Sequence, residues 1–290
     1  MAELASWNEG ATRRAITDFV TQVTTAGGSG FVAPDERIAT FDNDGTLWCE
    51  KPTYVQADFI LRTWGAMVAA DPTLRDRQPY KAVAERDMVW LGSLLDHVPE
   101  LLAGIGDAFG GKTTDEFESD VREFFDTVSH PTLGVPYTKV GYAPMRELVD
   151  FLAANDFRVF ICTGGGRDFV RVVGHEMYGV PRHRVIGSSS VLEYRDGHLV
   201  HTTTVELPID DGPGKPVHIF ARTGQLPLFA AGNSDGDIQM LESARFGLLV
   251  HHDDAAREFA YDGGAEHALT EAAVRGWSVA SMAADWSRVF

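Results

Sequence analysis

Two carboxylates, Asp42 and Asp44, stand two residues apart in the stretch FDNDGTLW, directly after the apolar residues 38–41. Asp, Asn and Gly are residue types that favour turns, so one interpretation of Asp-Asn-Asp-Gly is an ordinary turn at the end of a buried strand. The other interpretation is that the paired carboxylates hold a divalent cation while one of them attacks an electrophile. This second interpretation requires that other segments of the chain supply partners at the same place.

Short apolar runs predict the strands that position these carboxylates. Besides residues 38–41, four runs are typical of buried parallel strands: residues 157–162, 184–186, 226–231 and 246–250. Helical patterns alternate with these strands at residues 143–154, 167–178 and 216–223. The alternation predicts an α/β fold with a Rossmann-like, doubly wound parallel sheet. An Asp-Gly pair flanked by alternating residues predicts an added β-hairpin within residues 191–205.

The interval between the first and second strands is too long for one crossover and has a helical pattern throughout. Apolar residues at helical spacing mark three segments: Phe59, Ile60, Ala66 and Met67; Met88, Val89, Leu91, Leu94 and Leu95; and Phe117, Val121, Phe124 and Phe125. Thr113 and Glu116 have the spacing of a capping box at the start of the third helix. We therefore expect a helical cap domain at residues 52–135, inserted into an α/β core of residues 1–51 and 136–290.

Polar residues follow the carboxyl ends of the predicted strands, where open α/β sheets bind their ligands. Thr163 and three glycines follow the second strand and open a helix whose N-terminal amides can hold an anion. The oxygen-rich loop GNSDGD occupies residues 232–237, after the strand that ends at Ala231. Lys215 stands at the start of a predicted helix. The helix dipole disfavours a cation there, so the lysine is expected to have another partner. We expect these segments to converge beside Asp42 and Asp44.

This set of residue types suits phosphoryl transfer. An ionised aspartate can attack phosphorus once the repulsion between anions is cancelled. Oxygen ligands favour Mg²⁺, which binds a few protein groups together with the substrate phosphate. A lysine neutralises the transferred group, a threonine hydroxyl and neighbouring amides bind its oxygens, and a second aspartate exchanges protons with the leaving group and with water.

The four segments resemble, in chain order, the four motifs of the haloacid dehalogenase (HAD) superfamily. The helical run directly after the first motif is similar to that superfamily's C1-type cap. The hairpin and the run FICTGGGRDF most resemble the phosphoserine-phosphatase branch. The resemblance implies a Mg²⁺-dependent phosphatase that hydrolyses a small phosphomonoester through an aspartyl-phosphate intermediate.

The resemblance also implies a role for each matching residue. Asp42 would be the nucleophile and Asp44 the acid/base, with Thr163 and Lys215 completing the catalytic set. The implied phosphate contacts are Asn43, Gly45, Thr163, Gly164 and Lys215. The implied Mg²⁺ ligands are Asp42, Asp44 through its backbone carbonyl, Asn233 and Asp237.

One position departs from the family pattern. Asn233 stands where the family usually has a metal-binding aspartate, and its amide oxygen can bind Mg²⁺ without contributing a charge. Asp237 matches the second acid of the motif, and Asp235 is an additional carboxylate. The sequence leaves open which of Asn233, Asp235 and Asp237 ligates the metal directly.

Other residues near the motifs have both a structural and a functional interpretation. Trp48, Glu50 and Tyr54 follow the first motif and are candidates for the substrate pocket. Cys162 ends a buried strand and is expected to be a packed thiol. The run His251-His252-Asp253-Asp254 has the residue types of a metal cluster, but its place after the last predicted strand favours a solvated loop.

The composition limits the classes of partner. The 290 residues carry a net charge of −17 and two cysteines, with 44% hydrophobic residues. Such an acidic chain is not typical of nucleic-acid or anionic-membrane binding, and two cysteines are consistent with the cytoplasm. No signal peptide or long apolar run is evident, so we expect a cytoplasmic enzyme acting on a small phosphorylated metabolite.

Two alternatives remain. One is a dehalogenase of the same fold, which Asp44 disfavours because such enzymes do not need that acid/base. The other is a non-catalytic phosphate-binding or regulatory protein of the fold, which the intact set of Asp42, Asp44, Thr163 and Lys215 disfavours.

Overall fold

The computed structural model describes residues 3–93 and 96–290, and the chain divides into two compact units. The core unit comprises Met1–Pro52, Ser129–Ser188 and Pro208–Phe290, and the insert unit comprises Thr53–Val128 and Ser189–Leu207. Leu94 and Leu95, which the sequence assigns to a helix, lie outside the described residues. In the part of the chain that is described, no helix is long and apolar enough to cross a membrane.

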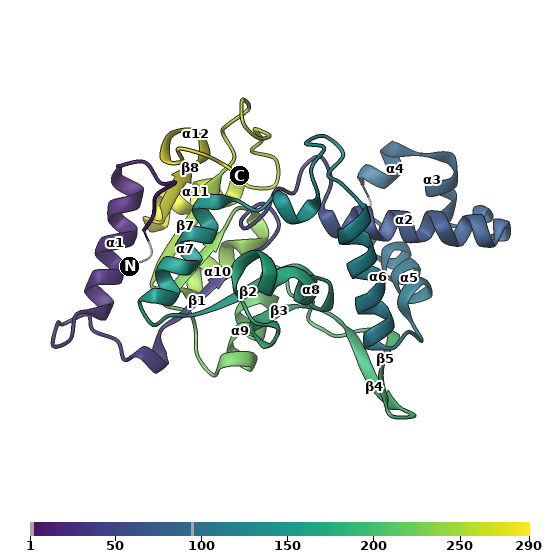
Figure 1. Cartoon of the computed structure of the whole chain (residues 1–290), viewed down its shortest axis with the longest axis horizontal. Helices are drawn as coiled ribbons and strands as arrows, with labels where there is room; N and C mark the ends of the chain where they lie inside the picture. Colours follow the sequence, from purple (N-terminus) through teal and green to yellow (C-terminus); the bar gives the residue numbers. More distant parts are fainter. Residues whose placement is uncertain (1–2, 94–95) are drawn as a thin grey trace. The chain divides into compact units, whose positions relative to one another are not determined.

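The core unit contains a six-stranded parallel sheet with the order β3-β2-β1-β6-β7-β8 (Figure 1). Its strands are β1 (Ile38–Phe41), β2 (Arg158–Gly166), β3 (Val185–Ser188), β6 (Phe229–Gly232), β7 (Phe246–His251) and β8 (Ser278–Ser281). This confirms the predicted α/β fold with its parallel sheet. The sequence analysis missed β8, because this edge strand is only half-buried and its sequence SVAS forms no continuous apolar run.

Helices pack on the two faces of this sheet, since alternate strand residues point to opposite sides. The helices are α1 (Ala11–Thr24), α7 (Ala143–Ala154), α8 (Arg167–Tyr178), α9 (Gly214–Thr223), α10 (Ile238–Ser243), α11 (Glu266–Arg275) and α12 (Met282–Asp285). On one face, Ile38 belongs to a buried cluster with Ile219 of α9 and Met240 of α10. On the other, the ring of Phe19 in α1 packs 4.9 Å from that of Phe246.

The central strand β1 positions the first motif. All four of its residues are buried, and Phe41 pairs with Ile161 on one side and Ala231 on the other. The Asp42 amide continues the ladder by donating to the carbonyl of Ala231 at 2.9 Å. Asp42 therefore leaves the sheet one residue beyond the level of Ile161 in β2 and of Ala231 in β6, whose last residue is Gly232.

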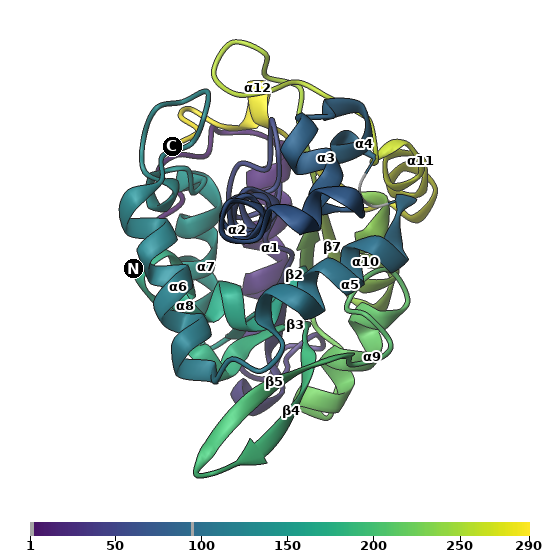
Figure 2. The same ribbon diagram turned by 90° about the vertical axis from the view of Figure 1, so that its right-hand side faces the viewer.

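The insert unit combines helices with the antiparallel hairpin (Figure 2). Its elements are α2 (Val55–Ala70), α3 (Tyr80–Glu85), α4 (Met88–Gly92), α5 (Val98–Phe109), α6 (Thr114–Thr127), β4 (Ser190–Arg195) and β5 (His198–Val205). Helix α5 lies beside β5. Asp196 and Gly197 both have positive φ, of 50° and 91°, as a two-residue hairpin turn of type I′ requires. The predicted hairpin is confirmed, and it packs with the inserted helices.

Aromatic packing holds the insert unit together. The Phe59 ring stacks on Phe109 at 5.5 Å and meets Phe117 and Phe124 edge-on. The predicted capping box at the start of α6 is present, because Thr113 accepts from the Glu116 amide and the Glu116 side chain accepts from the Thr113 amide. This capping box stabilises the first turn of α6, the helix that carries Phe117 and Phe124.

Candidate active site

Lys215 joins three of the four sequence motifs. Its Nζ lies 2.6 Å from Asp42 Oδ1 and 2.6 Å from Asp237 Oδ1, and it donates to the carbonyl of Cys162 at 3.1 Å. The lysine is only 2% exposed although it begins helix α9, where the helix dipole disfavours a cation. The two carboxylates offset this cost, and they raise the pKa of Lys215 well above its usual value despite the burial.

Asp237 has both carboxylate oxygens engaged. Oδ1 pairs with Lys215, and Oδ2 accepts from the amides of Asn233 and Ser234 at 3.0 Å and from the Ser234 hydroxyl at 3.1 Å. Ser234 and Asp237 thus form a capping box that holds the GNSDGD loop against the lysine. Oδ2 thus accepts three hydrogen bonds from the GNSDGD loop, whereas Oδ1 accepts one, from Lys215.

The carboxyl of Asp42 lies in an acidic, buried environment. Burial raises its pKa well above the ordinary value, the charge of Asp237 raises it further, and Lys215 opposes both effects. Lys215 is bound at Oδ1. Asp42 and Asp237 thus share one ammonium group, and the charge of Asp44 is close enough to raise the pKa of Asp42 further, so the site carries an excess of negative charge that a cation would balance.

Asp44 has a different environment from that of Asp42. Its carboxylate is half-buried and accepts a hydrogen bond of 2.8 Å from the indole Nε1 of Trp48. Burial raises the pKa of Asp44 to about 6, with the Trp48 hydrogen bond lowering it and the nearby charge of Glu50 raising it. A carboxyl that titrates near neutrality suits a group that must both give and take a proton.

β2 continues to Gly166, beyond Cys162 where the sequence analysis ended the strand. Thr163 and Gly164 therefore lie in its last part, at a turn in the strand where its pairing with β3 shifts register, directly after the Cys162 carbonyl that binds the lysine. The Thr163 side chain is buried, and its Oγ1 accepts from the Gly165 amide at 3.1 Å, while Gly164 is exposed. Gly187 on β3 makes room for this turn, because a Cβ there would come within 2.9 Å of the Thr163 methyl and 3.0 Å of the Arg167 backbone. The turn therefore presents backbone amides and a hydroxyl beside Lys215.

Gly45 and Asn233 are in close contact. Gly45 has a φ of 76°, and a Cβ on it would lie 2.1 Å from Asn233 Nδ2. The Thr46 hydroxyl donates to Asn233 Oδ1 at 2.9 Å. Asn233 Nδ2 and the side chain of Asn43 are buried without a hydrogen-bond partner among the described residues. The Asn43 atoms lie in the loop that carries Asp42 and Asp44, and Asn233 Nδ2 lies in the GNSDGD loop, which meets the first loop at Gly45.

The donors that fit a hard cation here are oxygens of mixed type. Within the described ranges no three His, Cys, Asp or Glu side chains form a metal-binding group. The available donors are the Asp42 carboxylate, the Asp44 backbone carbonyl and the Asn233 amide. If the Asn233 amide turned by half a rotation, Nδ2 would donate to Thr46 and the amide oxygen would take the unpartnered position. This donor set fits Mg²⁺, which prefers oxygen and retains several waters.

The remaining sequence candidates fall into different places. Asp235 accepts from the Ala268 amide at 2.8 Å and so fastens the first turn of α11. Glu50 is buried and accepts from the Tyr261 hydroxyl at 2.7 Å. Tyr54 precedes α2 in the insert unit and is 40% exposed. Trp48 contacts Asp44 directly, as described above.

The sequence analysis missed several buried residues behind the first motif. His252, which it placed in a solvated loop, is only 3% exposed, and its Nε2 lies 2.7 Å from the Gly45 carbonyl. That interpretation was wrong because residues 252–261 fold back on the core, where His252 contacts Glu258 and Tyr261. The Tyr178 hydroxyl is buried and unpartnered among described residues; burial raises its pKa, and the charge of nearby Asp44 raises it further. No local sequence pattern predicted that either residue would be buried behind the first motif.

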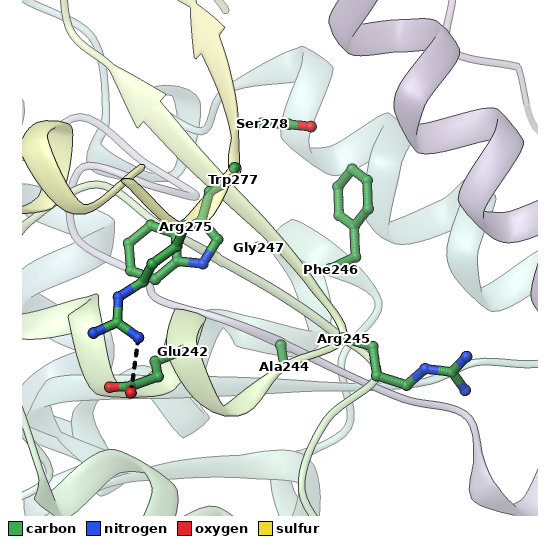
Figure 3. Close-up of a pocket in the computed structure, with 9 residues that line it drawn as sticks. Glu242, Ala244, Arg245, Phe246, Gly247, Arg275, Trp277 and Ser278 are labelled. Carbon is green, nitrogen blue, oxygen red and sulfur yellow. Dashed lines mark ion pairs between the residues drawn. The ribbon is translucent and has the colours of Figure 1, made fainter. Parts of the chain in front are cut away.

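A surface hollow of about 260 Å³ lies at the opposite edge of the sheet (Figure 3). It is lined by Phe246 and Ser278, the first residues of β7 and β8, and by Trp277, which packs against Gly247. Arg275 is held there by an ion pair of 2.8 Å with Glu242. Because ligands of such sheets bind at the carboxyl ends of the strands, this hollow is not part of the candidate site.

The fold and the site together define the class of protein: a doubly wound α/β chain with a helical insertion after its first strand and an acidic site at the carboxyl edge of the sheet. The chain belongs to the HAD, haloacid dehalogenase-like hydrolase, family, whose model matches residues 39–242. No match was found among curated proteins.

Solved structures give the same fold at low identity. A protein of unknown function from Bordetella pertussis Tohama I is 19% identical, with a TM-score of 0.51 over 84% of this chain and 98% of that chain. A conserved functionally unknown protein from Anaerococcus prevotii DSM 20548 is 14% identical, with a TM-score of 0.58 over 92% and 90%. A phosphoserine phosphohydrolase-like protein from Francisella tularensis subsp. tularensis SCHU S4 is 14% identical, with a TM-score of 0.41 over 74% and 88%. The first two support the fold, and the third carries no argument about activity.

The Trp48–Asp44 hydrogen bond leads to a test of the acid/base environment. The indole donor stabilises the ionised carboxylate, so the Trp48→Phe substitution should raise the pKa of Asp44 above about 6. The measurement is a carboxyl-carbon NMR titration of the metal-free protein, with Asp44→Asn to assign the signal. The control is Trp277→Phe at the opposite edge of the sheet. An Asp44 titration that stays in place or moves to lower pH in Trp48→Phe would contradict this assignment.

Proposed function

We propose that this chain is a Mg²⁺-dependent phosphatase that hydrolyses a small phosphomonoester through an aspartyl-phosphate on Asp42. The observation that carries the proposal is the position of Lys215, 2.6 Å from both Asp42 and Asp237 and hydrogen-bonded to the end of β2. It gathers a nucleophilic carboxylate, a cation and the Thr163 turn at one edge of the sheet. Membership in the HAD family is consistent with this chemistry.

The reaction has two steps. An Asp42 oxygen attacks phosphorus, the bond from phosphorus to the leaving oxygen breaks, and Asp44 gives its proton to that oxygen. Asp44 then takes a proton from water, which attacks phosphorus and releases phosphate and the Asp42 carboxylate. Lys215, the Thr163 hydroxyl and the amides near Gly164 neutralise and orient the phosphoryl oxygens, with Asn43 and Gly45 on the opposite loop. A pKa of about 6 for Asp44 suits both proton transfers.

The cation would be held by the Asp42 carboxylate, the Asp44 backbone carbonyl and the Asn233 amide. Mg²⁺ supplies positive charge that reduces the repulsion between the nucleophile and the phosphate. Asp237 has a supporting role in this proposal, because its oxygens are bound by Lys215 and by the amides of the GNSDGD loop. It holds the lysine and the loop that carries Asn233.

The insert unit is proposed to be the cap that selects the substrate. All the motif residues and the apolar cluster on the β1 sheet belong to the core unit, so the site does not depend on the insert for its framework. A lid of this kind excludes water and contacts the leaving group. The substrate is then a small phosphorylated metabolite whose leaving group the insert unit recognises, with Trp48, Glu50 and Tyr54 near the junction as pocket candidates.

The nucleophile is tested by Asp42→Asn. We expect loss of hydrolysis of an aryl phosphate by about 10³-fold or more, because an amide cannot form the acyl-phosphate. Circular dichroism should show an unchanged fold, and Asp235→Asn, which alters a carboxylate bound at α11, is the matched control that should retain most of the activity. Near-parental turnover by Asp42→Asn would rule out the aspartyl-phosphate mechanism.

The metal site is tested by Asn233→Asp. The substitution returns a charge to a proposed ligand, so the Mg²⁺ dissociation constant should fall by about tenfold, as a new charge–charge contact predicts. Calorimetric titration of the apo protein measures this directly, and chelation should abolish the activity of the parent. An unchanged dissociation constant, in a variant that still folds, would show that Asn233 is not a ligand.

The cap is tested by removing the insert unit. Short linkers that join Pro52 to Ser129 and Ser188 to Pro208 would leave the core sheet and every motif residue in place. Hydrolysis of a small aryl phosphate should partly survive, whereas the ranking of natural monoesters by kcat/KM should collapse. The dispersion of amide NMR signals reports folding. A folded variant with the parental substrate ranking would place selectivity in the core.

A further inference from the structure

A buried chain of polar side chains supports the first motif from outside the catalytic loop. His252 Nε2 lies 2.7 Å from the Gly45 carbonyl, and its Nδ1 lies 3.3 Å from Glu258 Oε2. Glu258 also accepts from the Tyr142 hydroxyl at 2.7 Å and from the Phe259 amide at 2.6 Å. The Tyr261 ring stacks on His252 with 4.4 Å between centroids. All these residues belong to the core unit, and none is needed for the chemistry described above.

The chemistry of the hydrogen-bonding groups defines which atoms donate and which accept in this series of side chains. A carbonyl oxygen can only accept, so His252 must carry a proton on Nε2 and donate it to Gly45. The donors around Glu258 outweigh the effect of its burial and hold its pKa below the ordinary value, so the carboxylate is an acceptor toward Nδ1. Both ring nitrogens thus face acceptor oxygens, of the Gly45 carbonyl and of Glu258. The ring is fixed at both nitrogens and on one face.

His252 binds the Gly45 peptide, whose position affects Asp44 on one side and Thr46 on the other. Gly45 lies between Asp44 and Thr46, and its amide donates to the Trp48 carbonyl at 2.8 Å. Its Cα is in contact with Asn233, so close that no side chain fits there. The Gly45 carbonyl is the third point of attachment, and His252 is the described residue that binds it. A rotation of this peptide would shift Asp44 on one side and the Thr46–Asn233 hydrogen bond on the other.

We propose that His252 is a positioning residue of the phosphatase site. Oriented by Glu258, it fixes the Gly45 peptide and thereby places Asp44 for proton transfer to the leaving group. This inference rests on the proposed function for its kinetic consequence, but the positioning itself does not depend on activity. It assigns a role to the HHDD segment that the motifs leave without one.

The kinetic test separates proton transfer from general loss of structure. The constant kcat/KM reports the steps up to phosphoryl transfer. In that step an alkyl leaving group needs a proton from Asp44, whereas a p-nitrophenyl group does not. His252→Leu should therefore lower kcat/KM for an alkyl phosphate by about tenfold more than for p-nitrophenyl phosphate, the scale of losses when an outer partner of a site is removed.

Two variants accompany this measurement. His252→Gln retains a side-chain N–H that can reach Gly45 and should restore most of the alkyl-to-aryl ratio. His251→Leu removes the neighbouring histidine, which binds Asp262 rather than Gly45, and should leave the ratio unchanged. Equal losses on both substrates in His252→Leu, or a ratio that His252→Gln does not restore, would overturn the proposal. If His252→Leu does not fold, Tyr142→Phe is measured, and it should lower the same ratio to a smaller extent because it removes one donor to Glu258.

A second readout is independent of catalysis. In the metal-free protein, the amide NMR signals of Gly45 and Thr46 should shift in His252→Leu and remain in place in His251→Leu. Unshifted signals in a folded His252→Leu protein would refute the positioning role even if the parent is an active phosphatase. Conversely, if the parent hydrolyses no phosphate ester, the proposed function fails while shifted signals still support the structural part of the inference.

Discussion

The structure of the site depends on one buried ammonium group shared among acceptors from three segments. An unpaired charge with the burial of Lys215 would be very costly, and losing one partner of such a pair costs about 3–5 kcal/mol. The lysine therefore holds Asp42 at the end of β1, the backbone at the end of β2 and Asp237 in the loop after β6 in one arrangement. The same contacts that stabilise the cation bring the reactive groups together.

Close approach of backbone segments is the second constraint. Gly45 and Gly187 allow contacts that a Cβ would prevent, with Asn233 in one case and with the Thr163 turn in the other. A site assembled on such turns has little tolerance for a shift of one peptide unit. The His252–Glu258 pair, buried below the loop, supplies a restraint that the loop itself lacks. Stability of the loop and placement of Asp44 are thus parts of the same interaction network.

The balance of charges in the site is set by buried carboxylates, one lysine and a neutral asparagine. Asn233 replaces a charged group with a neutral one, while Asp235, which is nearby in sequence, is bound to the start of α11. The carboxylates Asp42 and Asp44 both have raised pKa values, because burial outweighs the single ammonium group. An additional cation at the site would stabilise both in their ionised forms.

The sequence by itself determined the features that arise from local patterns. Apolar runs located β1, β2, β3, β6 and β7. Helical spacing located α7 and α8 with their observed ends. The Thr113 capping box and the Asp196-Gly197 turn formed as their residue types predict. Because parallel strands end at one sheet edge, the order of the motifs also predicted their convergence. The tertiary structure alone decided which acid binds Lys215, that Asp235 turns away to α11, that the hairpin packs with the inserted helices, and that His252 is buried against Gly45. These outcomes depend on contacts between residues that are 22 positions apart for Lys215 and Asp237, 33 for Asp235 and Ala268, and 207 for His252 and Gly45. No local pattern encodes such contacts.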